Sequence, residues 1–308
     1  MNKKLFRTHN ALKTPKFSDG RMPFHPILMM HAAHMAGYTY EQFMRDHHIL
    51  VESNMKCLEL YDHDAVSVIS DPFRETCAFG ADIHFAGNAS PSVNHIVRSL
   101  EDTLQLKCPD IYACERTFDR IQGVELFRRE LGADFPVIGW VEGPLAEASD
   151  LMGMSEMMME MMLNPEHIHI LVEKTLQTAK DFAAAQIKAG ANIIGVGDAV
   201  CSQISTELFI EFAFEAHKEL FKFIHEQGAL VKLHICGNIT HLLPYLAQED
   251  IDILDIDWMV DMKEAYIQMG AEIMLCGNFD PVSVIMSGTK EIIKQKFDEL
   301  SQSSFHGE

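Results

Sequence analysis

The chain lacks the features that mark a membrane protein or a secreted one. Its 308 residues contain no apolar run close to the roughly 20 residues that a transmembrane helix requires. The opening stretch MNKKLFRTHNALKTPKF is basic, but it has no apolar core and no small-residue cleavage site, as a secretory signal would. We therefore expect a cytoplasmic protein that does not contact a membrane.

Positive charge is also scarce. Lys and Arg number 25 against 45 Asp and Glu, which gives a formal net charge of −20. A surface of this sign repels the phosphates of nucleic acids, so the sequence disfavours a nucleic-acid partner. A more basic protein partner would suit the acidic surface, although the charge serves solubility equally well.

Linkers, repeats and a disulfide framework are missing as well. The seven cysteines are an odd set in a chain without a secretory signal, which favours reduced thiols or metal ligands over disulfides. Hydrophobic residues make up 47% of the chain, enough for a large core. With no low-complexity hinge, residues 1–308 are expected to form a single domain.

What the sequence does contain is an alternation of short apolar runs with longer amphipathic segments. This alternation is typical of βα units around a parallel sheet and predicts a TIM (β/α)₈ barrel. The eighth strand is missing from the given sequence, and a chain that continues naturally past Glu308 explains this more simply than an unusual closure. The seven expected strands cover residues 22–28, 64–70, 136–141, 191–197, 229–235, 252–257 and 271–277.

Active sites of such barrels lie at the carboxyl ends of the strands. The fifth expected strand ends in His234-Ile235-Cys236, and residues two apart in an extended segment project to the same side. An imidazole and a thiolate that converge in this way suit Zn²⁺, which binds nitrogen and sulfur ligands. Cys276, which ends the seventh strand, is either a third ligand or a packed thiol, and the sequence leaves both open.

Four segments resemble the uroporphyrinogen decarboxylase superfamily, and the likeness extends over nearly the whole chain. The resemblance implies the same barrel that the strand count predicts. The segments are GWVEGPLAEASDLMG (139–153), AGANIIGVGDAVCSQIS (189–205), LHICGNITHLLPYL (233–246) and LCGNFDPVSVIMSGT (275–289).

The resemblance favours one branch of this superfamily. Decarboxylases of the family carry an Arg-rich segment after the first strand that binds the acidic side chains of the porphyrinogen, whereas residues 27–37 here read ILMMHAAHMAG. The block around His234 and Cys236 is instead similar to the zinc-dependent methylcobamide:coenzyme M methyltransferases. Those relatives take a third zinc ligand from a Gly-Cys pair at the end of the eighth strand, farther downstream than this chain reaches.

The resemblance therefore implies transfer of a methyl group between a corrinoid, held on a separate corrinoid protein, and a small thiol such as coenzyme M bound to Zn²⁺. We expect His234, Cys236 and Cys276 as metal ligands, and Glu142 and Asp198 as catalytic residues at neighbouring strand ends. Arg74, Asn278 and Asp280 are expected to contact the cofactor or substrate. The alternatives are a tetrapyrrole decarboxylase and a non-catalytic corrinoid-binding barrel. The oligomeric state, a homo-oligomer included, stays open.

Overall fold

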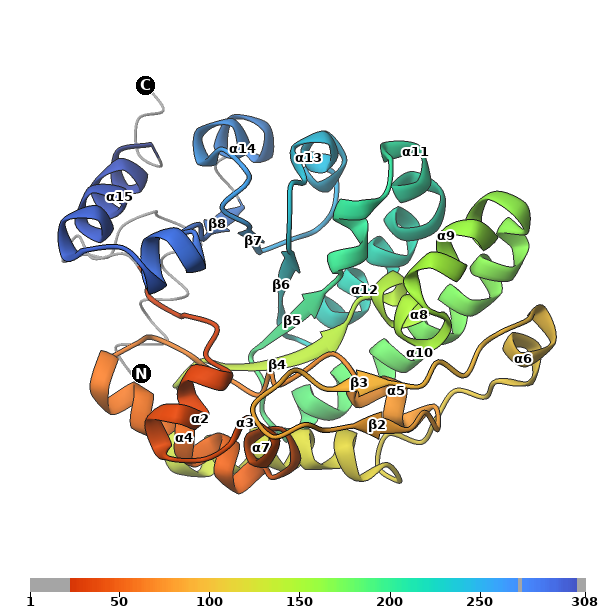
Figure 1. Ribbon diagram of the computed structural model, residues 1–308, viewed down its shortest axis with the longest axis horizontal. Helices are drawn as coiled ribbons and strands as arrows, with labels where there is room; N and C mark the ends of the chain where they lie inside the picture. The colour runs from red at the N-terminus through yellow and green to blue at the C-terminus, as the bar shows by residue number, and fades with distance from the viewer. Residues whose placement is uncertain (1–22, 271–272, 304–308) are drawn as a thin grey trace.

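A computed structural model describes residues 23–270 and 273–303 of the chain (Figure 1). Its centre is a curled sheet of six parallel strands in the order β1-β4-β5-β6-β7-β8. Each strand pairs with the next one along the chain in this order, which is the arrangement that repeated βα units produce. The strands are β1 (Val66–Ser67), β4 (Val137–Glu142), β5 (Ile193–Gly197), β6 (Leu230–Ile235), β7 (Ile253–Ile256) and β8 (Met274–Cys276).

Helices cover the convex side of this sheet. Among them, α7 and α10 pack on β4, and α12 packs on β6. Figure 1 shows the helices around the outer side of the curved sheet, with β8 and α15 at one end and α2 to α4 near the other. The longer helices are α4 (His47–Tyr61), α7 (Glu115–Leu131), α8 (Pro144–Met152), α9 (Met154–Leu163), α10 (Pro165–Ala189), α12 (Glu215–Glu226), α14 (Met262–Met269) and α15 (Lys290–Ser303).

The remaining elements are short. They are α2 (Met30–Ala36), α3 (Tyr40–Arg45), α5 (Arg74–Ala78), α6 (Leu100–Gln105), α11 (Thr206–Phe209), α13 (Leu243–Leu246), the 3₁₀ turns η1 (Ala199–Gln203) and η3 (Thr240–Leu242), the π turns η2 (Ile210–Phe214) and η4 (Pro281–Met286), and the hairpin of β2 (Ile83–His84) and β3 (Ser92–Val93).

The concave side of the sheet carries a small apolar cluster of its own. It contains Ala65, Ile69, Ile138, Trp140, Ile193 and Ile253, and it is separate from the larger core under the helices. Gly195 makes room for the largest member, since a Cβ at this position would lie 2.2 Å from the indole ring of Trp140. The bottom of the half-barrel is thus packed, as in closed barrels, and polar residues follow toward the strand ends.

The described residues form a half-barrel of six parallel strands, one fewer than the seven barrel strands expected from the sequence. Residues 23–28, the described part of the first expected strand, form no strand, although the Asp64 amide donates to the carbonyl of Phe24 at 2.6 Å. The physical reason is Pro23 and Pro26, which lack the amide hydrogens that a ladder needs. The other six expected strands are present, with the one at 64–70 shortened to β1.

Two of the longer amphipathic segments, residues 165–190 and 206–228, form helices. The first is α10, which begins at Pro165 and ends before Gly190, whose φ of 115° only glycine adopts readily. The second is divided by η2 into α11 and α12. No helix among the described residues is both long and apolar enough to span a bilayer. The basic opening stretch of the sequence lies outside the described residues.

Candidate functional site

The polar side chains of the concave face come from strands that pair directly. His234 of β6 is the register partner of Asp255 of β7, which in turn pairs with Cys276 of β8. Lys232 lies two residues before His234 and therefore projects to the same face. These four residues form a polar layer next to the apolar cluster, at the carboxyl ends of the strands.

His234 and Cys236 bring two possible metal donors together. Nε2 of His234 lies 3.0 Å from Sγ of Cys236. The side chain of His234 is 23% exposed and Cys236 is exposed, so both reach the mouth of the half-barrel. Gly237 follows with a φ of 92°, a left-handed conformation that suits glycine and turns the chain away directly after Cys236.

The carboxylate of Asp255 lies beside the second nitrogen of the His234 imidazole. Its Oδ2 lies 3.3 Å from Nδ1 of His234 and 2.8 Å from Nζ of Lys232. Burial lowers the pKa of His234, but the contacts with Asp255 and Cys236 outweigh burial and raise that pKa to about 10. Burial acts to raise the pKa of Asp255, yet the Lys232 ammonium holds it well below its ordinary value. An ionised carboxylate therefore orients His234.

Cys276 does not join this pair. Its Sγ lies 3.9 Å from Nζ of Lys232 and 3.9 Å from Nε2 of His25, and burial raises the pKa of the thiol to about 12. Two strand spacings, about 9–10 Å, separate its position from that of His234, because Asp255 stands between them in the register. In the part of the chain that the structure describes, the donor atoms of His234, Cys236 and Cys276 form no compact group.

Glu142 and Arg74 form a buried ion pair at the end of β4. Nη2 of Arg74 lies 2.7 Å from Oε1 of Glu142, and its Nε lies 3.4 Å from Oε2 of Glu75. Burial raises the pKa of Glu142 well above its ordinary value, against the opposing attraction of Arg74. Arg74 is 1% exposed, so this guanidinium serves Glu142 and Glu75 rather than an open surface.

More carboxyl groups lie next to this pair than its one guanidinium can neutralise. Burial, followed by repulsion from Asp150, raises the pKa of Glu147 well above its ordinary value. Burial and repulsion from Glu75 raise the pKa of Asp150 to about 8. The hydroxyl of Thr76 donates to Glu147 at 3.2 Å. Burial therefore favours the protonated form of these carboxyl groups over the charged form.

Asp198 follows β5 but faces the helices. It is fully buried, its Oδ2 lies 3.1 Å from Nε2 of His217 on α12, and the amide of Leu145 donates to the same oxygen at 3.3 Å. A backbone hydrogen bond joins Asp198 to His234, in which the Asp198 amide donates to the His234 carbonyl at 3.0 Å. The carboxylate beside the His234 imidazole is that of Asp255, rather than that of Asp198 or Glu142.

Asn278 and Asp280 have structural partners. Nδ2 of Asn278 donates to the carbonyl of Val260 at 2.6 Å and to that of Asp257 at 3.1 Å, which ties the end of β8 to the loop after β7. Asp280 accepts from the amide of Ser283 at 3.0 Å and thus caps η4. Neither contact brings these two side chains to the His234 and Cys236 pair.

Two contributors to the site escaped the sequence analysis. They are Asp255 and Lys232, neither of which is among the residues expected from the sequence. Asp255 lies within the run DILDID of the sixth expected strand, and Lys232 within the fifth. A charged residue at an inward position of a buried strand indicates such a contributor, because a buried charge needs a partner. Both Asp255 and Lys232 have this pattern.

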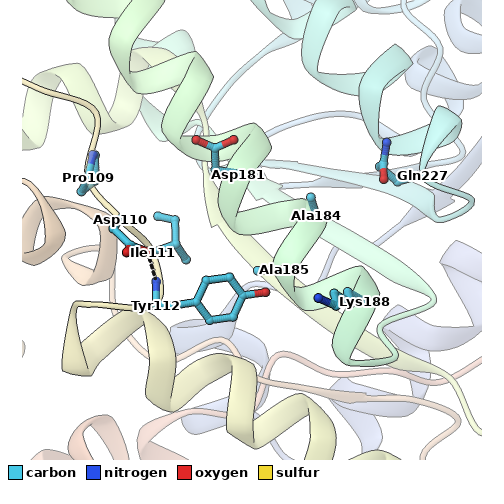
Figure 2. A pocket seen from close by; sticks show the side chains of 9 residues that line it. All are labelled: Pro109, Asp110, Ile111, Tyr112, Asp181, Ala184, Ala185, Lys188 and Gln227. Carbon is cyan, nitrogen blue, oxygen red and sulfur yellow. Dashed lines mark hydrogen bonds between the residues drawn. The ribbon is translucent and has the colours of Figure 1, made fainter.

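A hollow of about 520 Å³ lies away from the strand ends (Figure 2). It is lined by the loop around Tyr112 and by the second half of α10, including Asp181 and Lys188, with the Tyr112 ring directed toward that helix. This half of α10 leads into the amino end of β5. The hollow is therefore at the end of the sheet opposite to the polar layer, and we assign it no chemistry.

Three comparisons with known proteins bear on this arrangement. The chain is 26% identical over 293 residues to "Uroporphyrinogen decarboxylase" of Carboxydothermus hydrogenoformans, covering 90% of this chain and 82% of the relative. It is 25% identical over 268 residues to the protein of the same name from Neisseria meningitidis serogroup A, covering 84% and 74%. The solved "methyltransferase from Methanosarcina mazei" superposes with a TM-score of 0.89 at 21% identity, covering 97% of this chain and 90% of the other.

The structural likeness shows that this chain and the Methanosarcina mazei protein share a fold. The family to which the chain belongs is shown by a match over almost its whole length. A sequence model of the family described as Uroporphyrinogen decarboxylase (URO-D) matches residues 7–307. This match includes β1, every later strand of the sheet and the residues of the polar layer. Members with these names are enzymes, and from the extent of the match we conclude that the chain belongs to the uroporphyrinogen decarboxylase family.

Proposed function

We propose that the chain is a zinc-dependent methyltransferase that moves a methyl group from a corrinoid to a thiol. The observation that carries the proposal is the 3.0 Å approach of His234 Nε2 and Cys236 Sγ at the mouth of the half-barrel. A bound Zn²⁺ would supply Lewis acidity that ionises a thiol ligand at neutral pH. The name of the Methanosarcina mazei neighbour, a methyltransferase, agrees with this class of reaction.

Two of the three protein ligands that a catalytic zinc ion takes are present, and no third donor joins them among the described residues. Nitrogen and sulfur are the donor atoms that Zn²⁺ prefers, and Asp255 contacts the second imidazole nitrogen, as carboxylates do beside zinc-bound histidines. Because Cys236 is exposed and His234 partly so, substrate can approach the same atoms. A catalytic site keeps such an open side, whereas a structural zinc site is closed by protein ligands.

Trp140 and Glu142 lie over the strand end beside this pair. Glu142, Gly197 and His234 are register neighbours on β4, β5 and β6, and the ring centroid of Trp140 lies 6.2 Å from that of His234. A Cβ at position 197 would lie 3.4 Å from Oε2 of Glu142 and 3.2 Å from Nε1 of Trp140. A substrate that approaches the donor pair from this side would therefore contact the Trp140 indole and Glu142.

The reaction balances without a further reactant. The thiolate sulfur forms a bond to the methyl carbon, the cobalt–carbon bond breaks, and its electron pair stays on cobalt. The two cations at these strand ends, Lys232 and Arg74, are paired with Asp255 and Glu142. A sulfonate such as that of coenzyme M would compete with these carboxylates, so we propose recognition of the acceptor mainly through its sulfur.

A second candidate function is tetrapyrrole decarboxylation, because the curated relatives carry that name. A porphyrinogen with several carboxylates requires several free cations. Among the described residues near the strand ends, Arg74 pairs with Glu142 and Arg116 lies 2.5 Å from Asp71. These pairs leave little positive charge for the substrate, which favours the methyltransferase proposal.

Metal analysis combined with turnover of methylcobalamin tests the proposal. We expect the purified chain to bind zinc and to transfer the methyl group of free methylcobalamin to a small thiol. Cys236→Ser and His234→Ala should abolish transfer, and Cys108→Ser should not, since Sγ of the exposed Cys108 only donates to the Lys174 carbonyl at 3.6 Å.

Two results would contradict the proposal. One is a folded wild-type chain that binds no zinc from a zinc-containing buffer. The other is release of carbon dioxide from uroporphyrinogen that a chelator and the Cys236→Ser substitution leave unchanged, which would establish the second candidate. A folded, zinc-free chain that binds methylcobalamin without turnover would identify a corrinoid-binding protein.

A further inference from the structure

A second set of possible metal donors lies on the other side of the sheet. It consists of Asp198 after β5, Cys201 on η1 and His217 on α12. One donor atom from each lies within 4.8 Å of the other two, and all three residues are 0% exposed. Because Gly197 faces the concave side and Asp198 follows it, this set lies across the sheet from His234 and Cys236.

The geometry around His217 is that of a metal-binding histidine. Its Nε2 lies 3.1 Å from Oδ2 of Asp198, and its Nδ1 lies 3.3 Å from Oε2 of Glu249. Histidines that bind metals usually direct their second nitrogen to a carboxylate, which fixes the ring and its tautomer. Glu249 has this position here, and Nε2 is directed to Asp198 and Cys201.

The carboxyl group of Asp198 has an oxygen left over. Its Oδ1 is buried and has no hydrogen-bond partner among the described residues, whereas Oδ2 is shared by His217 and the Leu145 amide. A buried oxygen without a partner costs free energy that a bound cation would recover. This unsatisfied atom is a second indication of a ligand, independent of the grouping of the three side chains.

We propose that Asp198, Cys201 and His217 bind a structural Zn²⁺ ion, with Glu249 orienting His217. Nitrogen, sulfur and oxygen donors together select zinc over Ca²⁺ or Mg²⁺, which prefer oxygen. All three residues are fully buried, so the ion enters as the chain folds. It would fasten the end of β5 to α12 and, through Leu145, to the start of α8.

Charge alone does not require the metal, which is why an experiment must decide. Without an ion, a protonated His217 between Asp198 and Glu249 next to a Cys201 thiol carries the same net charge as Zn²⁺ with a Cys201 thiolate and a neutral imidazole. Metal binding replaces two protons in this comparison. The ion-free network is therefore the alternative that the test addresses.

The test starts from a chain without the exposed donor pair. The double variant His234→Ala/Cys236→Ser is refolded with Zn²⁺, desalted and analysed for metal, with circular dichroism to show that it is folded. We expect one zinc ion per chain, lost on adding Cys201→Ser or His217→Gln and kept on adding Cys108→Ser. Refolding with Co²⁺ should give a thiolate-to-cobalt charge-transfer band that Cys201→Ser removes.

The outcomes separate this inference from the proposed function. Zinc that persists in the double variant and disappears with Cys201→Ser supports the buried site, whatever the activity of the wild-type chain. A folded double variant without zinc overturns it, as does zinc that persists after both Cys201→Ser and His217→Gln. If His217→Gln fails to fold, the Co²⁺ band of the Cys201→Ser variant still decides.

Discussion

Oδ2 of Asp255 lies 3.3 Å from Nδ1 of His234, and the two residues are direct register partners on β7 and β6. Nε2 of the same ring lies 3.0 Å from Sγ of Cys236. The contact with Asp255 joins the donor pair to the interior of the half-barrel, because the same carboxylate oxygen lies 2.8 Å from the buried Nζ of Lys232. We therefore expect metal binding by His234 and Cys236 to depend on Asp255, which lies deeper in the half-barrel.

Asp255→Asn should weaken zinc binding by about 10–100-fold, the usual effect of removing a carboxylate beside a zinc-bound histidine. The physical reason is loss of the negative charge that orients the imidazole and makes it a better ligand. Competition with a chelating dye measures the affinity. Asp252→Asn is the matched control, because Asp252 precedes the same strand at its other end and pairs with His225. Equal affinities of Asp255→Asn and wild type would refute the prediction.

Lys232→Met should destabilise the fold by about 3–5 kcal/mol, since it leaves the buried Asp255 carboxylate without its cation. Lys232→Met/Asp255→Leu should recover most of this loss, because an apolar pair replaces the ion pair. Urea unfolding measures both effects. The double variant should nevertheless bind zinc as weakly as Asp255→Asn, and a full return of zinc affinity together with stability would contradict our assignment of Asp255.

Gly195→Ala should cost about 1–3 kcal/mol, the usual cost of overpacking, because the new methyl group would overlap the Trp140 ring. In a Trp140→Leu background the space exists, and the same substitution should cost much less. A double-mutant cycle in urea unfolding measures the coupling. Additive effects of the two substitutions would show that the indole ring does not lie over Gly195.

The stability of the protein should fall as the pH rises from about 4 to about 8, and Asp150→Asn should reduce this fall. Burial, then repulsion from Glu75, raises the pKa of Asp150 to about 8 in the folded chain. Between the unfolded pKa near 3.9 and this value, the unfolded carboxyl is ionised and the folded one keeps its proton, so raising the pH favours unfolding.

Thermal unfolding at pH 5 and pH 9 measures this effect. The gain in melting temperature from Asp150→Asn should be larger at pH 9 than at pH 5. Asp181→Asn, on the exposed side of α10, is the control and should shift both values equally. A gain that is larger at pH 5 would give the opposite sign and refute the assignment.

The strands illustrate how far sequence reasoning extends in this fold. The run ANIIGVG predicts a strand because it is almost entirely apolar or glycine, as are strands of sheets covered on both faces. In the structure every residue of β5 is buried. The run MPFHPIL has similar apolar content, but its prolines remove the amides that would pair it with β1. The hairpin of β2 and β3 has strands of two residues each, too short for a periodicity to indicate it.

The sequence by itself determined that His234 and Cys236 face the same way, because the two-residue period of an extended strand is a local property. It could not determine which strands stand beside β6 in which register. Only the tertiary structure placed Asp255 against His234, kept Cys276 two strands away and directed Asp198 to His217 on the helical side. Strand register and helix packing depend on contacts between residues far apart in the chain. Such contacts cannot be predicted from a local pattern of residues.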